Sequence, residues 1–290
     1  MNLPYQDMYW RSDDGLRLHA RDYRAQPESK LPVICIPGLT RNAADFERLA
    51  PWIAARGRRV FAVDLRGRAG SDHDPEPKRY SVPTYVADVL ALMRDREIPR
   101  AVFVGTSLGA LVTMAIASKR SEAVAAAVLN DAGPEVGRAA LARIGAYAGK
   151  SVPPMSLEDA AAYARRNGGI AHPHYTDADW RAAAMRMFRQ RDDGLFEPDY
   201  DPKVVRTASP LLLRLTRPLM WMAFKRLARG RPTLLLRGAV SDVLEPGLVA
   251  RMVKAAPSMR VAEIPDVGHA PDLSEPIARL AIDALLTESA

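Results

Sequence analysis

Apolar and polar positions alternate along the first half of the chain in two different rhythms. Short apolar runs bounded by glycine, proline or charged residues are typical of buried strands, whereas apolar residues three and four positions apart are typical of helices. The expected strands are 31–36, 59–63, 101–104 and 124–129. The expected helices between them are 43–56, 81–96 and 108–119. Strands that alternate with helices predict a mostly parallel sheet with helices on both faces.

The rhythm changes in the middle of the chain. From about 137 to 229 the sequence is rich in Ala, Arg and aromatic residues at helical spacing, and it contains no convincing strand. Such a stretch is too long to be a plain loop. The alternation then resumes, with strands expected at 233–236 and 260–264 and helices at 246–255 and 277–286. We therefore predict an α/β core domain of residues 1–133 and 231–290 and an inserted all-helical cap domain of residues 134–230.

A candidate nucleophile lies in the sequence Gly105-Thr106-Ser107-Leu108-Gly109, where an expected strand ends and an expected helix begins. The pattern G-x-S-x-G at such a junction forms a sharp turn that exposes the serine hydroxyl. The start of a helix also stabilises negative charge that develops beside it. A serine that merely caps a helix is common. The strand before Ser107 and the apolar helix after it favour instead a serine that attacks a carbonyl carbon.

A serine hydroxyl needs a base to take its proton, and the chain has five histidines. We expect His269 to be this base, because it directly follows a late strand and precedes the last helix. The base in turn needs an acid that holds its tautomer. Asp242 and Asp131 each lie just past a strand. The order Ser107, Asp242, His269 along the chain matches a known order of triad residues, and we favour Asp242 over Asp131 on that ground.

Acyl transfer also needs hydrogen-bond donors for the carbonyl oxygen as it becomes negatively charged. One expected donor is the backbone N–H of Leu108, the residue after the nucleophile. The second is expected from the loop after the strand 31–36, where Gly38 allows a close approach of the backbone. Within that loop we predict the N–H of Leu39.

With these motifs in place, the chain resembles the α/β-hydrolase superfamily, in the capped group that holds esterases, lactonases, C–C bond hydrolases, epoxide hydrolases and haloalkane dehalogenases. The resemblance covers nearly the whole chain. It implies that Ser107, Asp242 and His269 form a catalytic triad. Five motifs carry it: Pro37-Gly38-Leu39, the segment 64–71, Gly105-Thr106-Ser107-Leu108-Gly109, the segment 237–242, and Gly268-His269.

The chain departs from the usual family pattern at two places. Pro37-Gly38 stands where His-Gly is usual, and Arg68-Ala69 stands where His-Gly is usual in the motif Asp-x-Arg-Gly-His-Gly-x-Ser. Neither change removes a catalytic group, and Asp64 is expected to be structural, as is Arg66. Dehalogenases and epoxide hydrolases of this family carry Asp at the nucleophile position, so the serine of this chain argues against both activities.

The resemblance implies a hydrolase of a carboxylic ester or lactone of a small, largely apolar substrate, acting through an acyl-enzyme. The cap is expected to close over the site, exclude water and shape the pocket. Expected substrate-binding residues are Gly38, Arg41, Tyr147 and Trp180. One alternative is a C–C bond hydrolase that acts on a β-diketone or ring-cleavage product with the same triad, which the position of Arg41 favours. Others are a cofactor-independent dioxygenase and a non-catalytic ligand receptor on this fold.

Composition narrows the class of partner. The chain of 290 residues has a net charge of +7, but its arginines are scattered along helices and form no run of like charges. This pattern indicates a solvated basic surface and no nucleic-acid partner. Cys35, the single cysteine, lies in an apolar run and is expected in the core. The expected partner is a small-molecule substrate, and the sequence does not distinguish a monomer from a homodimer.

The remaining expectations concern location and cofactors. The first ten residues contain no apolar signal segment, and no stretch of 18 apolar residues occurs. We therefore expect no membrane association and a cytoplasmic location. A serine mechanism needs no metal or organic cofactor. His172 and His174 flank Pro173, but no carboxylate or cysteine shares their spacing, so we do not expect them to hold a metal.

Overall fold

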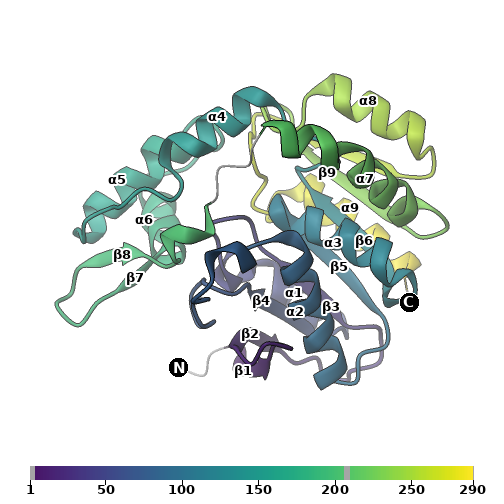
Figure 1. Ribbon diagram of the computed structural model, residues 1–290, viewed down its shortest axis with the longest axis horizontal. Helices are drawn as coiled ribbons and strands as arrows, with labels where there is room; N and C mark the ends of the chain where they lie inside the picture. Colours follow the sequence, from purple (N-terminus) through teal and green to yellow (C-terminus); the bar gives the residue numbers. More distant parts are fainter. Residues whose placement is uncertain (1–3, 206–209, 290) are drawn as a thin grey trace.

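The structure is a computed structural model, and it describes residues 4–205 and 210–289. Its centre is a sheet of eight strands in the order β1-β2-β4-β3-β5-β6-β9-β10 (Figure 1). From β4 to β10 neighbouring strands are parallel, whereas β1 and β2 form an antiparallel edge. The predicted mostly parallel α/β sheet is therefore confirmed. The strands are β1 Gln6–Arg11, β2 Arg17–Tyr23, β3 Val33–Ile36, β4 Val60–Asp64, β5 Ala101–Thr106, β6 Val124–Asn130, β9 Thr233–Gly238 and β10 Arg260–Ile264.

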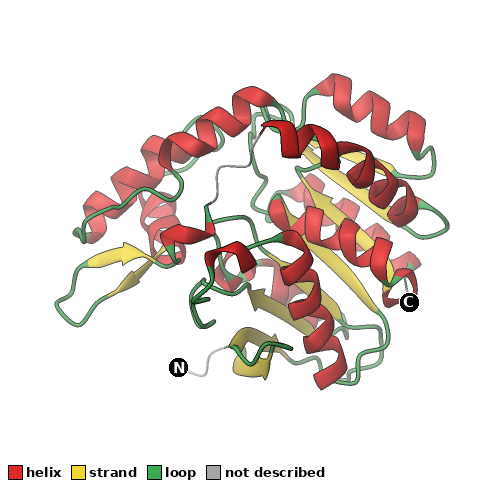
Figure 2. Cartoon of the chain, viewed as in Figure 1, coloured by secondary structure: helices red, strands yellow, loops and turns green. Residues whose placement is uncertain are grey.

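Helices cover both faces of this sheet (Figure 2). One face packs against α2 Val82–Asp95, α3 Leu108–Lys119, α7 Pro210–Ala228 and α8 Pro246–Ala255. The other packs against a 3-10 turn at Ala43–Phe46, α1 Leu49–Ala54 and α9 Pro276–Glu288. Successive residues of β3 alternate between the two hydrophobic clusters, as the two-residue repeat of a strand requires. Burial on both faces explains why these strands are apolar runs without polar alternation.

The cap lies between β6 and β9. It contains α4 Arg138–Tyr147, α5 Leu157–Gly168 and α6 Asp177–Met187, and α5 and α6 enclose a small hydrophobic cluster around Trp180. The prediction of an all-helical cap is wrong, because β7 Phe188–Gln190 and β8 Phe196–Pro198 form an antiparallel hairpin that projects from it (Figure 1). Each strand has three residues, which is too short for the alternation that reveals a strand in a sequence.

Helix α7 belongs to the core by its packing. It lies beside α3 (Figure 1), and Ala223, Phe224 and Leu227 are buried in the same hydrophobic cluster as α3. The range 134–230 predicted for the cap thus includes a helix that covers the sheet. Residues 206–209, within that range, lie outside the described residues.

Two further expectations can be compared with the described residues. Cys35 is fully buried in β3, and burial raises the pKa of its thiol, so it is a core residue. Among the helices in 4–205 and 210–289, none combines the length and the apolar character needed to cross a lipid bilayer.

Candidate active site

The turn between β5 and α3 holds Ser107 in a rare backbone conformation, with φ 53° and ψ −111°. A side chain at Gly105 would place its Cβ 2.4 Å from the carbonyl carbon of Gly109. A Cβ at Gly109 would lie 2.0 Å from the carbonyl oxygen of Ile36 in β3. Both glycines are therefore required by the close approach of strand and helix. The strained turn presents Ser107 to a cavity between core and cap.

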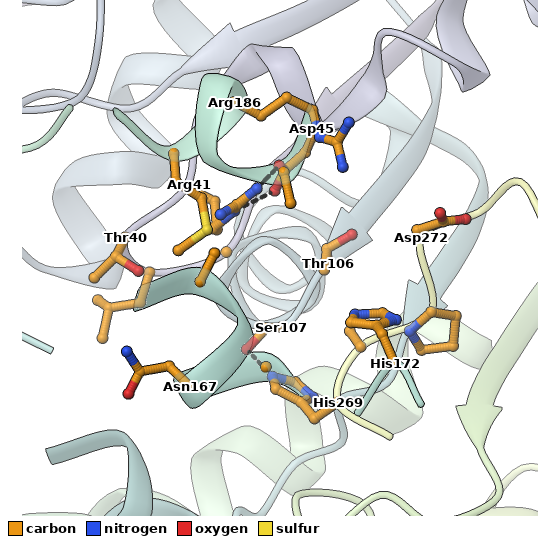
Figure 3. Close-up of a pocket in the computed structure, with 18 of the residues that line it drawn as sticks. Thr40, Arg41, Asp45, Thr106, Ser107, Asn167, His172, Arg186, His269 and Asp272 are labelled. Carbon is orange, nitrogen blue, oxygen red and sulfur yellow. Dashed lines mark hydrogen bonds and ion pairs between the residues drawn. The ribbon is translucent and has the colours of Figure 1, made fainter. Parts of the chain in front are cut away.

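His269 lies directly against Ser107. Its Nε2 is 3.0 Å from Ser107 Oγ (Figure 3). The loop that carries His269 follows β10 and is fixed at two points: the N–H of Gly268 donates to Ala171 O at 2.8 Å, and Asn130 Nδ2 donates to Pro271 O at 2.9 Å. The structure thus brings together the serine and the histidine that the sequence singles out.

The carboxylate on the far side of His269 belongs to Asp131, directly after β6. Its Oδ2 lies 2.8 Å from His269 Nδ1. The Asp131 side chain is fully buried, and it also accepts hydrogen bonds from Gly238 N at 3.0 Å and Ser241 Oγ at 2.5 Å. These contacts leave the carboxylate one orientation. A proton on Nδ1 that faces Asp131 leaves the lone pair of Nε2 directed at Ser107.

Asp242, the acid predicted from chain order, does not contact His269. Its two carboxylate oxygens accept hydrogen bonds of 2.7 Å from Nε and a terminal nitrogen of Arg143, on α4 of the cap. These bonds lower the pKa of Asp242, whose side chain is 37% exposed. The structure corrects the prediction for a simple reason: Ser241, and not Asp242, is the member of this loop that points at Asp131.

The two backbone donors expected for an oxyanion lie beside Ser107. Leu108 is the first residue of α3, and Leu39 lines the cavity in the loop after β3. Within the described parts of the chain, the N–H of neither residue donates to a protein acceptor. A Cβ at Gly38 would lie 3.8 Å from Ser107 Cβ and 3.4 Å from Arg41 Cγ, so this loop packs closely on the serine. Both N–H groups are therefore available to a bound molecule.

The cavity over Ser107 has a volume of about 220 Å³. Core loops form its floor and α4, α5 and α6 of the cap form its walls. All four residues predicted to bind substrate line it: Gly38, Arg41, Tyr147 and Trp180. Other lining residues were not predicted, namely Arg48, Asn167, Tyr175, Arg186 and Asp272. The positions of Asn167, Tyr175 and Arg186 depend on how the cap docks, for which the sequence carries no direct signal.

Every arginine of this cavity is paired with a carboxylate. Arg41 Nε is 2.9 Å from Asp45 Oδ2 (Figure 3), and Arg143 binds Asp242 as described above. The remaining pairs are Arg186 with Glu47 at 3.0 Å and Arg48 with Asp272 at 3.6 Å. The cavity therefore offers polar groups whose charges are already neutralised within the protein.

His172 also lines the cavity (Figure 3). Its ring stacks on Tyr175, with centroids 4.5 Å apart and planes at 17°. Burial lowers the pKa of His172 to about 4, so its ring is neutral at neutral pH. The His174 side chain, by contrast, is 74% exposed.

Comparison with known proteins agrees with this architecture. A protein chain described as an alpha/beta hydrolase from Novosphingobium aromaticivorans has 39% identity and superimposes over 100% of both chains with a TM-score of 0.91. A 3-hydroxybutyrate-oligomer hydrolase from Cupriavidus necator is 33% identical over 93% of each chain. A 2-(acetamidomethylene)succinate hydrolase from Mesorhizobium japonicum is 28% identical over 80% of this chain and 79% of its own.

The family relationship follows from the extent of these matches. The model of the alpha/beta hydrolase family matches residues 33–284, which includes the strands around Ser107, the cap and the His269 loop. The mostly parallel sheet with helices on both faces is the fold that the sequence predicted. The chain belongs to the alpha/beta hydrolase family and is a hydrolase.

Proposed function

We propose that this protein hydrolyses a carboxylic ester through an acyl-enzyme formed on Ser107. The observation that carries the proposal is the continuous chain of hydrogen bonds from Ser107 Oγ to His269 Nε2 at 3.0 Å and from His269 Nδ1 to Asp131 at 2.8 Å. In the first step Ser107 Oγ attacks the carbonyl carbon while His269 Nε2 accepts the hydroxyl proton. Asp131 stabilises the positive charge that His269 then carries.

The tetrahedral intermediate places a negative charge on the former carbonyl oxygen. The N–H groups of Leu39 and Leu108 donate to this oxygen, which lowers the barrier of the step. When the C–O bond to the leaving group breaks, His269 returns its proton to the leaving alkoxide. A water molecule then loses a proton to His269 and attacks the acyl carbon, and collapse of the second intermediate releases the acid and restores Ser107.

The substrate we propose is an ester of a short hydroxy acid. The relative from Cupriavidus necator is named for hydrolysis of 3-hydroxybutyrate oligomers, and the match covers 93% of each chain. A cavity of about 220 Å³ suits a short acyl chain. The Arg41–Asp45 pair within it can donate to an ester carbonyl and accept from a hydroxyl. A lactone, in which the same bond closes a ring, fits this chemistry too.

The alternative of C–C bond cleavage on a ring-cleavage product is less well supported by the cavity. Such substrates carry carboxylates, which need a cation to bind them. The cavity arginines, including Arg41, are each matched by a carboxylate of the protein. An uncharged ester, such as an alkyl ester or a lactone of a hydroxy acid, meets this environment without breaking an ion pair.

The proposal is tested by comparing substrates on one preparation of the enzyme. The panel is 4-nitrophenyl acetate and butyrate, the linear dimer of 3-hydroxybutyrate as its methyl ester, a γ-lactone and a β-diketone. We expect turnover of the esters and labelling of Ser107 by a fluorophosphonate, located by mass spectrometry. Ser107→Ala should lose both signals. Turnover of the diketone alone, or an unlabelled Ser107 together with inert esters, would refute an ester hydrolase.

A further inference from the structure

Arg68 is a fully buried arginine next to the loop after β3 that lines the cavity. Its Nε and one terminal nitrogen donate to the carbonyl oxygen of Leu39 at 3.0 and 2.8 Å. The other terminal nitrogen donates to Arg66 O at 2.6 Å and to Tyr85 Oη at 2.9 Å. No carboxylate in the described parts of the chain lies within 4.0 Å of this guanidinium. Its donors are therefore directed to backbone carbonyls and a phenol.

The neighbouring Arg66 has a different set of partners. Arg66 is also buried, but its guanidinium contacts three carboxylates, those of Asp14, Asp74 and Asp88. A buried charge is normally paired in this way, because an unpaired one loses its hydration without compensation. Arg68 keeps its charge buried beside Leu39 instead. What distinguishes Arg68 from the other buried arginines is that its two-nitrogen contact is made to Leu39, in the loop that lines the cavity over Ser107.

The bonds of Arg68 fix the backbone at the residue that donates to the oxyanion. The Leu39 N–H shares a peptide unit with Gly38 O, and in a trans peptide these two groups point in opposite directions. Gly38 O accepts from Arg41 N at 3.3 Å, which holds that peptide from one side. Gly38 has no side chain to restrain it further. The two bonds from Arg68 to Leu39 O hold the next peptide and so complete the restraint.

We propose that Arg68 is a positioning residue for the oxyanion hole: it holds Leu39 so that the N–H faces the oxygen of the tetrahedral intermediate. This inference rests on the proposed function of Ser107. The same charge also adds positive potential near that oxygen, since no carboxylate of the described chain compensates it at close range. Arg68 stands at the position where the family motif usually has His. A histidine there could not place two nitrogens on the carbonyl oxygen of Leu39, as Arg68 does.

The test compares two esters that differ only at the carbonyl oxygen, the atom that becomes the oxyanion. 4-Nitrophenyl butyrate and its thiono analogue, with C=S in place of C=O, are hydrolysed by wild type and by Arg68→Lys. Sulfur is a weak acceptor, so the thiono ester gains little from a well-placed N–H. Loss of the two-pronged contact should reduce kcat/KM for the oxygen ester by about tenfold or more, given that a lost donor costs about 10²–10³-fold. The thiono ester should lose far less.

Arg58 provides a matched control. It is also buried, and its guanidinium donates to backbone carbonyls, those of Leu31 at 2.8 Å and Leu286 at 2.7 Å, away from the cavity. Arg58→Lys therefore imposes the same kind of change on folding. We expect it to leave the ratio of oxygen-ester to thiono-ester rates as in wild type, whatever it does to the Tm.

A second variant and a second measurement keep the proposal testable if Arg68→Lys does not accumulate. Arg68→Gln retains one N–H donor toward Leu39, and it should show the same selective loss. Inhibition by a trifluoromethyl ketone, whose adduct with Ser107 carries an oxyanion, should weaken about tenfold or more while KM for the ester stays within twofold. Equal losses for both esters and unchanged inhibition would overturn the role of Arg68. A wild-type enzyme that neither cleaves the esters nor reacts at Ser107 would refute the proposed function, and the role of Arg68 with it.

Discussion

Arg143 lies across the carboxylate of Asp242, with two nitrogen–oxygen distances of 2.7 Å. This pair joins α4 of the cap to the loop after β9, and it engages both oxygens of the residue that chain order favoured as the triad acid. Asp131 takes the place against His269 instead. Both aspartates lie between Ser107 and His269 in the sequence, so their order along the chain could not distinguish them. The same substitution should therefore affect activity severely at Asp131 and only slightly at Asp242.

Asp131→Asn should lower kcat for a 4-nitrophenyl ester by about 10³–10⁴-fold, because the amide no longer holds the productive tautomer of the histidine. Asp242→Asn should keep kcat within about threefold and lower stability by no more than about 1 kcal/mol, since its ion pair is more than a third exposed. Steady-state rates and thermal unfolding of both variants test this. A severe loss of kcat in Asp242→Asn with an active Asp131→Asn would reverse the assignment.

The strained backbone at Ser107 should make a glycine there more stable than an alanine, although neither variant is active. Ser107 has φ 53° and ψ −111°, a region that costs a residue with a side chain about 1–3 kcal/mol. Ser107→Gly should therefore be more stable than Ser107→Ala by about 1 kcal/mol, although both lack the hydroxyl. The alanine variant is the control for loss of the hydroxyl and its hydrogen bond to His269. Equal Tm values of the two variants would contradict a strained turn.

The buried, neutral ring of His172 should make the protein less stable as the pH falls. Burial lowers its pKa to about 4 from 6.5, so the unfolded chain binds its proton more readily. The stability that neutral His172 contributes is complete above about pH 6.5 and is lost as the pH falls toward 4. Across that window the wild type should lose up to about 3 kcal/mol relative to His172→Gln. Denaturant unfolding at several pH values measures the difference.

The control for His172 is His174→Gln, since the His174 side chain is 74% exposed. If the difference between wild type and His172→Gln changes with pH no more than the difference for His174→Gln, the buried neutral histidine is not the cause.

The buried carboxyl group of Asp199 should make stability depend on pH in the opposite direction. Burial raises its pKa to about 6, and its Oδ2 accepts a long hydrogen bond from Asn42 Nδ2 at 3.4 Å. The folded protein therefore binds this proton more tightly than the unfolded chain. Its contribution is complete below the ordinary pKa near 3.8 and is lost as the pH rises through 6. Asp199→Asn should be more stable than wild type by up to about 3 kcal/mol at pH 8 and not at pH 4.

Asp193→Asn is the control for Asp199→Asn, because Asp193 lies in the same hairpin region with a side chain that is 49% exposed. A gain at pH 8 that is equal for both variants would attribute the effect to net charge and not to burial of Asp199.

The parts of the fold that follow local rules could be predicted from the sequence. The parallel strands, α3 after the serine turn and the position of His269 depend on apolar runs and on glycines at close contacts. The choice of Asp131 could not be made, because it depends on where a side chain points. Asp131 has φ 53°, a left-handed conformation that turns its carboxylate toward His269, and no sequence pattern signals it.

The hairpin of the cap and the packing partner of α7 could not be predicted for a different reason. Its hairpin has strands of three residues, and α7 has the same helical spacing whether it packs on the cap or on α3. Periodicity reports which face of a helix is apolar, but not which partner covers it. The cavity residues His172 and Arg186 are set by that docking, so their roles emerge from the tertiary structure.

The packing of α7 on α3 also determines which part of the inserted segment supports the sheet. Because Val204 and α7 both pack in the core cluster, a change confined to the β7-β8 hairpin would leave Phe224 and Leu227 covering the sheet. Loss of α7 itself would uncover that apolar surface. Among the described residues, the helix that closes the sheet therefore follows the cavity-lining helices in the chain without being one of them.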